Sequence, residues 1–122
     1  AEHGIHPVVD LGVWWHDQTN LPLPLGGNVV RKDLGPPLIE TIARLLKESI
    51  QYALDHREEA LEYALSYARE LDPALADRFV GMYVNEWTLD YGERGRAAVR
   101  ALLQRGYEVG LLPNPVSVEF VG

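Results

Sequence analysis

The chain contains no cysteine among its 122 residues. Disulfides, thiolate nucleophiles and cysteine-ligated metal sites are therefore excluded. Basic residues are also scarce, because 11 Lys and Arg stand against 18 Asp and Glu, which gives a net charge of −7. A nucleic-acid-binding face needs positive charge to neutralise phosphates, and an anionic membrane surface repels an acidic chain. We therefore expect neither nucleic acid nor a membrane as a partner.

Long apolar runs are absent too. No stretch approaches the about 20 apolar residues that cross a bilayer. The start, AEHGIHPVV, has neither a basic region nor an apolar core, so no signal peptide is expected. It also lacks an initial Met, which fits a fragment, a processed chain or simple Met removal. Hydrophobic residues nevertheless make up 47% of the sequence, enough for one globular domain with a modest core.

Side chains that could carry catalysis do not form a recognisable set. His3 and His6 are three residues apart beside Glu2, but no third ligand follows at helical spacing, so we expect exposed imidazoles. There is no nucleophile elbow and no phosphate-binding loop. The carboxylates on predicted solvent faces include Glu58, Glu59, Glu62, Glu70 and Asp77. The sequence therefore predicts no metal site and no catalytic residue within the chain.

The most informative segment runs from Leu21 to Gly35 and reads LPLPLGGNVVRKDLG. Its two prolines remove backbone donors and force an extended path. The glycines that follow, Gly26 and Gly27, allow another group to approach the backbone closely. This pattern suits a strand that crosses between two lobes beside a ligand. The alternative is an ordinary edge strand that leaves a loop.

Three segments are predicted as strands: residues 5–10, residues 25–31 and, more weakly, an edge strand at 116–121. Between the first two, Asp10 can cap a short helix that carries Trp14 and Trp15. Adjacent tryptophans point to different sides, so we expect one in the core and the other at a cleft or an interface.

The rest of the chain, from Leu38 to Gly110, is predicted to be helical, with a break at residues 88–92. Apolar residues recur at helical spacing along the first of these helices. They are Leu38, Ile39, Ile42, Leu45, Leu46, Ile50, Ala53 and Leu54.

Capping residues set the expected limits of the later helices. Asp55 is predicted to cap a helix over residues 57–71, and Asp72 followed by Pro73 to start the next one. Gly110 is expected just after the last helix. Asn85 is expected to end a helix, or else to reach across to another lobe or to a ligand.

Two or three short strands cannot form a sheet that covers four helices, because even an isolated two-stranded unit is marginal in water. The missing strands must come from upstream sequence, a partner chain or a second copy. We therefore expect marginal stability from a monomer of this chain alone.

Two longer runs, VVDLGVWWHDQTNLPLPLGGNVVRKDLG and YVNEWTLDYGERG, resemble one family. They are similar to the C-terminal part of the 1,4-dihydroxy-6-naphthoate synthases, which act on cyclic dehypoxanthinyl futalosine on the way to menaquinone. The resemblance implies an α/β fold of the periplasmic-binding-protein type, with two lobes, of which this chain is the mostly helical C-terminal half. It also implies a cytoplasmic lyase that needs no cofactor.

The resemblance divides the chain into three parts. Residues 1–20 would end the second lobe, 21–32 would cross between the lobes, and 33–122 would return to the first lobe. The positions that match the family's crossing segment, Pro24, Leu25, Gly26 and Asn28, are candidates for binding a small-molecule substrate. The catalytic base is expected upstream of this chain. Two alternatives stay open: a binding module of the same fold without catalysis, and an inactive fragment that associates with itself.

Overall fold

The computed structural model describes residues 6–67 and 72–122. They form two compact units, each made from separate stretches of sequence. Unit 1 contains the residues up to Leu25 together with Gly92–Val118. Unit 2 contains Gly26–Tyr91 together with Glu119–Gly122. No helix in the described stretches is long and apolar enough to span a bilayer.

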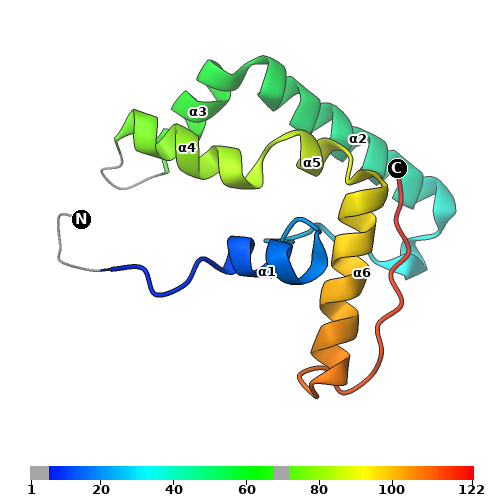
Figure 1. The fold of residues 1–122 in the computed structure, drawn as a ribbon. Coiled ribbons are helices and arrows are strands. Elements are labelled where there is room, and N and C mark those ends of the chain that lie inside the picture. Colours follow the sequence, from blue (N-terminus) through cyan, green and yellow to red (C-terminus); the bar gives the residue numbers. More distant parts are fainter. Residues whose placement is uncertain (1–5, 68–71) are drawn as a thin grey trace. The chain divides into compact units, whose positions relative to one another are not determined.

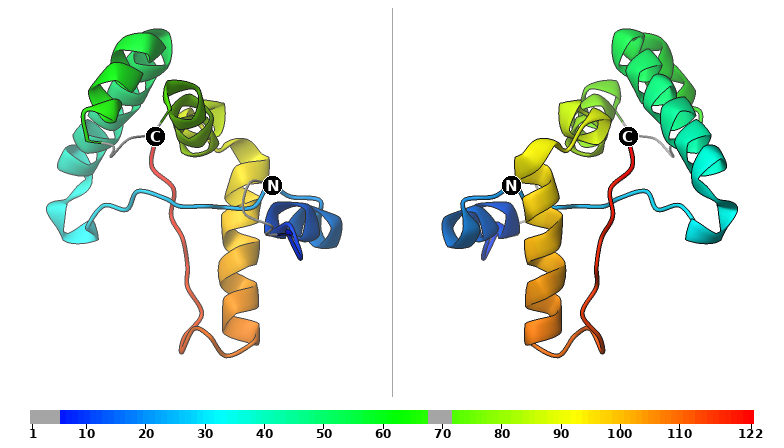
Figure 2. Two further views of the ribbon diagram at one scale, coloured as in Figure 1. Left: turned by 90° about the vertical axis from the view of Figure 1, so that its left-hand side faces the viewer. Right: turned by 90° about the vertical axis from the view of Figure 1, so that its right-hand side faces the viewer.

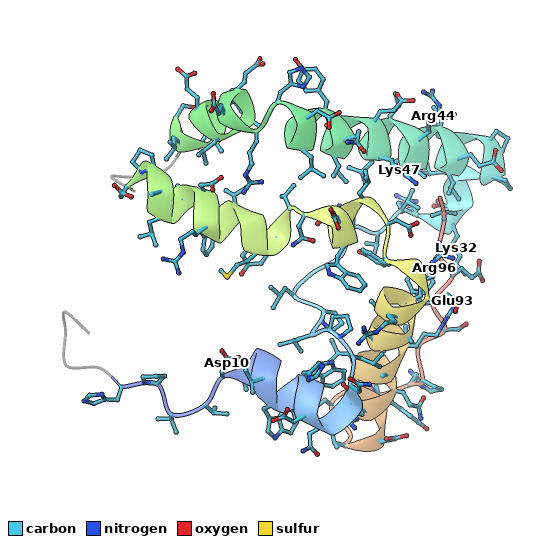
Figure 3. The ribbon with its side chains drawn as sticks, turned by 45° about the horizontal axis from the view of Figure 1, so that its top comes forward. Asp10, Lys32, Arg44, Lys47, Glu93 and Arg96 are labelled. Carbon is cyan, nitrogen blue, oxygen red and sulfur yellow. The ribbon has the colours of Figure 1, made fainter. Side chains whose placement is uncertain are left out.

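Unit 1 is built from α1 (Leu11–Thr19) and α6 (Gly92–Glu108). The carboxylate of Asp10, labelled in Figure 3, accepts a hydrogen bond from the Val13 amide at 3.0 Å, as predicted for the cap of α1. At the other end Asn20 adopts the left-handed conformation with φ of 55°, and its amide donates to the His16 carbonyl at 2.7 Å. Asparagine tolerates this conformation better than most residues, so α1 stops there.

The core of unit 1 is the Trp15 ring. Trp15 is 3% exposed, whereas Trp14 is 49% exposed, which confirms that one member of the pair is buried. The guanidinium of Arg105 on α6 lies 5.1 Å from the Trp15 ring centroid, within cation–π range. Gly95 and Ala98 are the buried residues of α6.

The chain reverses after α6. Gly110 has φ of 75°, and its amide donates to the Tyr107 carbonyl at 2.9 Å. The amides of Leu111 and Leu112 both donate to the Gly106 carbonyl. The prediction that a glycine ends this helix is confirmed, and the following segment runs back alongside α6 (Figures 1 and 2).

Unit 2 is a helical assembly. It contains the short 3₁₀ helix η1 (Lys32–Leu34) and helices α2 (Pro36–Asp55), α3 (Arg57–Leu65), α4 (Pro73–Tyr83) and α5 (Glu86–Leu89). Helix α2 packs against η1, α3 and α5, and α3 packs against α4 (Figure 1). Arg44 and Lys47 project from α2, as labelled in Figure 3.

Two predicted caps in unit 2 have opposite outcomes. Asp72 caps α4 as expected, because its carboxylate accepts from the amides of Ala74 and Leu75 at 3.0 and 3.1 Å. The prediction for Asp55 is wrong: α2 runs through this residue, and the carboxylate accepts instead from the Gln51 side chain at 2.8 Å. Gln51, four residues earlier on the same helix face, therefore occupies the carboxylate predicted to cap the next helix.

The joint between α2 and α3 is therefore His56, whose side chain makes no cap. Its amide still donates to the Tyr52 carbonyl at 2.9 Å, so the first helix ends one residue later than predicted. Helix α3 is described to Leu65, with a turn at residues 66–67. The predicted continuation over 68–71 lies outside the described residues.

The predicted strands are wrong. The described part of the chain contains no strand: residues 25–31 and 116–121 lack one, and so do the described residues of 5–10. A strand needs a backbone ladder with a neighbouring segment, and no such ladder is assigned to these extended segments among the described residues. The expectation of a mostly helical chain is confirmed, whereas its α/β character is not seen.

Little of the hydrophobic surface is covered. Among the described hydrophobic residues only Trp15, Ala76 and Ala98 are buried, and α2 contains no buried residue. Large apolar side chains on α2 and α4 are about half exposed, for example Leu45 at 53% and Phe79 at 54%, so these helices have open apolar faces.

Candidate functional site

The first half of the candidate segment is attached to α1 in unit 1. The Trp15 indole N–H donates to the Pro22 carbonyl at 3.0 Å. The Thr19 hydroxyl donates to the Trp15 carbonyl at 2.8 Å and accepts from the Leu21 amide at 3.1 Å. These three bonds hold the start of the proline-rich segment against α1.

Helix α6 adds a further attachment within unit 1. The Arg94 guanidinium donates to the Asn20 carbonyl at 2.8 Å, where α1 ends and the segment begins. Of the two candidate residues on this side, Pro24 is half-buried and Leu25 is exposed. The segment therefore leaves unit 1 from a fixed start, with its candidate side chains still accessible.

The second half of the segment, in unit 2, contains two glycines in different surroundings. No described atom lies within 4 Å of the position that a Cβ would take on Gly26. At Gly27 the same position lies 3.3 Å from the Tyr91 hydroxyl oxygen. Neither glycine has a positive φ, so the backbone conformation does not demand glycine. Tyr91 accounts for Gly27, whereas the space beside Gly26 is open and the neighbouring candidate Asn28 is exposed.

Tyr91 is a neighbour of Gly27 that the sequence reasoning missed. Besides its approach to Gly27, its ring meets Phe120 edge-on, with the centroids 6.0 Å apart. Nearby in the sequence of the tail, Glu119 accepts from the Lys32 ammonium at 2.7 Å. The C-terminal residues thus contact Tyr91 and η1 within unit 2. The only sequence signal was an aromatic residue at the predicted helix break.

Asn85 has a structural role in unit 2. Its side-chain oxygen accepts from the Trp87 amide at 2.9 Å, and its side-chain nitrogen donates to the Gly81 carbonyl at 3.0 Å. The Thr88 hydroxyl accepts from the Asn85 amide at 3.2 Å, which completes a capping box for α5. The sequence predicts that Asn85 ends a helix, whereas α4 ends with Val84 as its C-cap and Asn85 begins α5. The prediction holds only in part, because the Asn85 side-chain nitrogen donates to a carbonyl in the last turn of α4 while its oxygen caps α5.

A second polar cluster joins α3 to α4. Arg57 donates to the Asp77 carboxylate at 2.7 Å and to the Asp77 carbonyl at 3.0 Å. Gly81 provides space, because a Cβ there would lie 3.1 Å from the guanidinium. A shallow hollow of about 520 Å³ adjoins this pair. It is lined by Leu54, Arg57, Gly81, Val84, Asn85, Glu86 and Trp87, and by none of the four candidate residues.

The remaining titratable groups lie mostly at the surface. His6 is exposed, and His3 lies outside the described residues. In the described stretches no three His, Asp or Glu side chains come together as a metal site would require. The Arg31 guanidinium, which donates to the Asp33 carboxylate at 2.9 Å, lowers the pKa of that carboxyl. Both partners are solvent-exposed, and the pair stabilises the turn before α2.

A family model described as menaquinone biosynthesis matches residues 1–108. The chain belongs to this family. It is 42% identical over 111 residues to the 1,4-dihydroxy-6-naphthoate synthase of Streptomyces coelicolor. It is 44% identical over 114 residues to the synthase of the same name from Thermus thermophilus. These alignments cover 91% and 93% of the chain.

A solved structure shows the same relationship. The crystal structure of protein AF1704 from Archaeoglobus fulgidus superimposes with a TM-score of 0.84 at 41% identity, over 91% of this chain. The shares of the relatives that are covered are much smaller: 39% and 42% of the two synthases and 42% of the AF1704 chain. The chain therefore spans about two fifths of the length of the proteins that it matches.

Proposed function

We propose that this chain supplies the C-terminal part of a carbon–carbon lyase that converts cyclic dehypoxanthinyl futalosine to 1,4-dihydroxy-6-naphthoate in menaquinone biosynthesis. One observation carries the proposal: two synthases of this name, from different organisms, are more than 40% identical to the chain over more than nine tenths of its length. As the resemblance implies, the lyase is cofactor-independent and its base belongs to the remaining part of the family protein. A cytoplasmic location stays a prediction.

In this proposal the complete protein has two α/β lobes of the periplasmic-binding-protein type, and residues 21–32 cross between them. Two features support a crossing role. Pro22 and Pro24 leave the segment with few donors for a sheet. The start of the segment is also held in unit 1, where the Trp15 indole donates to the Pro22 carbonyl.

The proposed substrate site is the stretch Pro24, Leu25, Gly26 and Asn28. Gly26 is its most specific element, because neither a positive φ nor a described neighbour explains why a side chain is missing there. Bare backbone lets a ligand come within hydrogen-bond distance of the peptide groups. Lobe closure over this stretch would exclude water during the elimination.

The test uses a chimera in which this chain replaces the aligned region of the Thermus thermophilus synthase. We expect the chimera to convert the substrate, with the product followed by liquid chromatography and mass spectrometry. Gly26→Ala should lower kcat/KM by about tenfold or more, because a methyl group displaces the substrate from its reactive position. The same change should leave the urea midpoint nearly unaltered, since no described atom contacts the new methyl group.

The alternatives give different results in the same assays. Binding of the substrate without turnover would indicate a binding module. No binding, together with self-association of the isolated chain, would indicate an inactive fragment. An active chimera in which Gly26→Ala keeps full kcat/KM would refute the assignment of the site while leaving the reaction in place.

A further inference from the structure

The Tyr91 hydroxyl lies beside the bare backbone of the candidate segment in unit 2. Tyr91 follows directly on α5, whose last turn closes where the Asp90 amide donates to the Glu86 carbonyl at 3.0 Å. The residue is half-buried, and its ring meets the Phe120 ring edge-on with the centroids 6.0 Å apart. A phenylalanine would make the same ring contact. The hydroxyl therefore needs a separate explanation.

This hydroxyl has no hydrogen-bond partner among the described residues. By contrast, the hydroxyls of Tyr63 and Tyr67 lie 3.1 Å apart and bond to each other. The oxygen of Tyr91 lies 3.3 Å from the position that a Cβ would take on Gly27, so the missing side chain leaves room for it against the backbone. A tyrosine hydroxyl can both donate and accept, and both capacities are available at this point of the segment.

The backbone beside the hydroxyl is suited to receive a ligand. No ladder is assigned to the described residues 25–31. Side chains of an extended chain alternate between two faces, and its N–H and C=O groups point sideways between these faces. One face is open at Gly26, where no described atom lies within 4 Å of the Cβ position, and the Tyr91 hydroxyl borders the segment at Gly27. A ligand along the edge of this stretch would meet peptide groups and the hydroxyl together.

We propose that Tyr91 is a further substrate-binding residue, whose hydroxyl donates a hydrogen bond to an oxygen of the substrate lying along Gly26 and Gly27. The inference rests on the proposed function for the identity of the ligand. The proposed product, a dihydroxynaphthoate, carries hydroxyl and carboxylate oxygens, which are acceptors for a neutral phenol.

The test is Tyr91→Phe in the Thermus thermophilus chimera, because this change removes the hydroxyl and keeps the ring. The matched control is Tyr83→Phe on α4. Tyr83 is half exposed, and its ring also contacts a phenylalanine, Phe79, with the centroids 5.3 Å apart. Steady-state kinetics give KM and kcat, and isothermal titration calorimetry gives the Kd of 1,4-dihydroxy-6-naphthoate. Urea unfolding of each variant separates a change in binding from a change in folding.

We expect Tyr91→Phe to raise KM and the product Kd about three- to tenfold, the effect of one neutral hydrogen bond, while kcat stays within about twofold. The urea midpoint should not change, because no described group loses a partner. Tyr83→Phe should leave KM and Kd within about twofold of the unmodified chimera.

Unaltered KM and Kd values for Tyr91→Phe would overturn the inference. So would an equal rise for Tyr83→Phe, or a rise that comes with a lowered urea midpoint, since the hydroxyl would then have a structural role. Turnover with an unaltered KM would refute this inference alone. A chimera that makes no product, but whose Kd for the naphthoate rises in Tyr91→Phe, would refute the proposed reaction alone. A chimera that neither binds the naphthoate nor turns over would refute both.

Discussion

Replacing Trp15 by phenylalanine should destabilise the chain by removing the attachment between α1 and the candidate segment. The indole is buried, donates to the Pro22 carbonyl at 3.0 Å and lies under the Arg105 guanidinium. Phenylalanine keeps an aromatic ring at this position but has no N–H. The change therefore tests the hydrogen bond and the packing, while the site stays hydrophobic.

The magnitude follows from three losses. The hydrogen bond to a part-buried carbonyl is worth about 1 kcal/mol. The smaller ring gives up roughly 40 Å² of buried apolar area, which is about 1 kcal/mol. A weaker interaction with the guanidinium adds about 0.5 kcal/mol. Together they lower the free energy of unfolding by about 2–3 kcal/mol, a large fraction of what a chain with so few buried side chains can have.

Urea unfolding followed by far-ultraviolet circular dichroism measures this loss without relying on tryptophan fluorescence. Trp14→Phe is the matched control, because the adjacent indole is half exposed and should cost no more than about 0.5 kcal/mol. If the two variants shift the urea midpoint equally, the Trp15 anchor does not exist and the support for a fixed crossing segment is lost.

Three further changes test local features. Asp72→Ala should lower the free energy of unfolding by about 1 kcal/mol in urea titrations, because two amides at the start of α4 lose their cap. Arg31→Gln should raise the pKa of Asp33 in NMR titrations. Since the wild-type pKa is lowered, the contribution of this pair to stability is lost as pH falls through that pKa, and the variant should lack this pH dependence. Gly27→Ala should change the free energy of unfolding less favourably in the wild-type background than in a Tyr91→Phe background, because the new methyl group would lie 3.3 Å from the Tyr91 hydroxyl oxygen, and a double-mutant cycle measures this coupling.

The helices could be predicted because their signals are local. A carboxylate at Asp10 or Asp72 needs only amides two or three residues away, and both caps are present in the structure. The same reasoning failed at Asp55, where Gln51 offered a competing partner on the same helix. Local patterns thus located the helices well, but they could not decide between two partners of similar strength.

The strand predictions were wrong for a different reason. Residues 25–31 have a β-branched centre at Val29 and Val30, which favours an extended chain. An extended chain becomes a strand only when another backbone supplies hydrogen bonds, and most of the family fold lies beyond this sequence. The sheet proposed for the complete protein is therefore a prediction about residues that this chain does not contain.

The candidate site also has features that the local sequence predicts and others that depend on distant residues. The proline and glycine pattern predicted an accessible, donor-poor segment, and the structure leaves Leu25, Gly26 and Asn28 exposed. The sequence did not predict that Tyr91 would approach Gly27, because 64 residues separate the two positions. Contacts between such distant residues depend on how the helices in between pack, which the spacing of apolar residues does not determine.

The exposed apolar faces of the helices and the bare backbone at Gly26 are both explained if further structure covers them in the complete protein. Half-exposed apolar residues on a helix, such as Phe79 and Met82 on α4, and a glycine that no described neighbour requires are both costly in an isolated chain. Each becomes useful when further structure is added, a packed segment over α4 and a substrate beside Gly26. The kcat/KM of Gly26→Ala in the chimera tests the second addition directly. A large loss places one wall of the binding site within these 122 residues, and an unchanged value removes it.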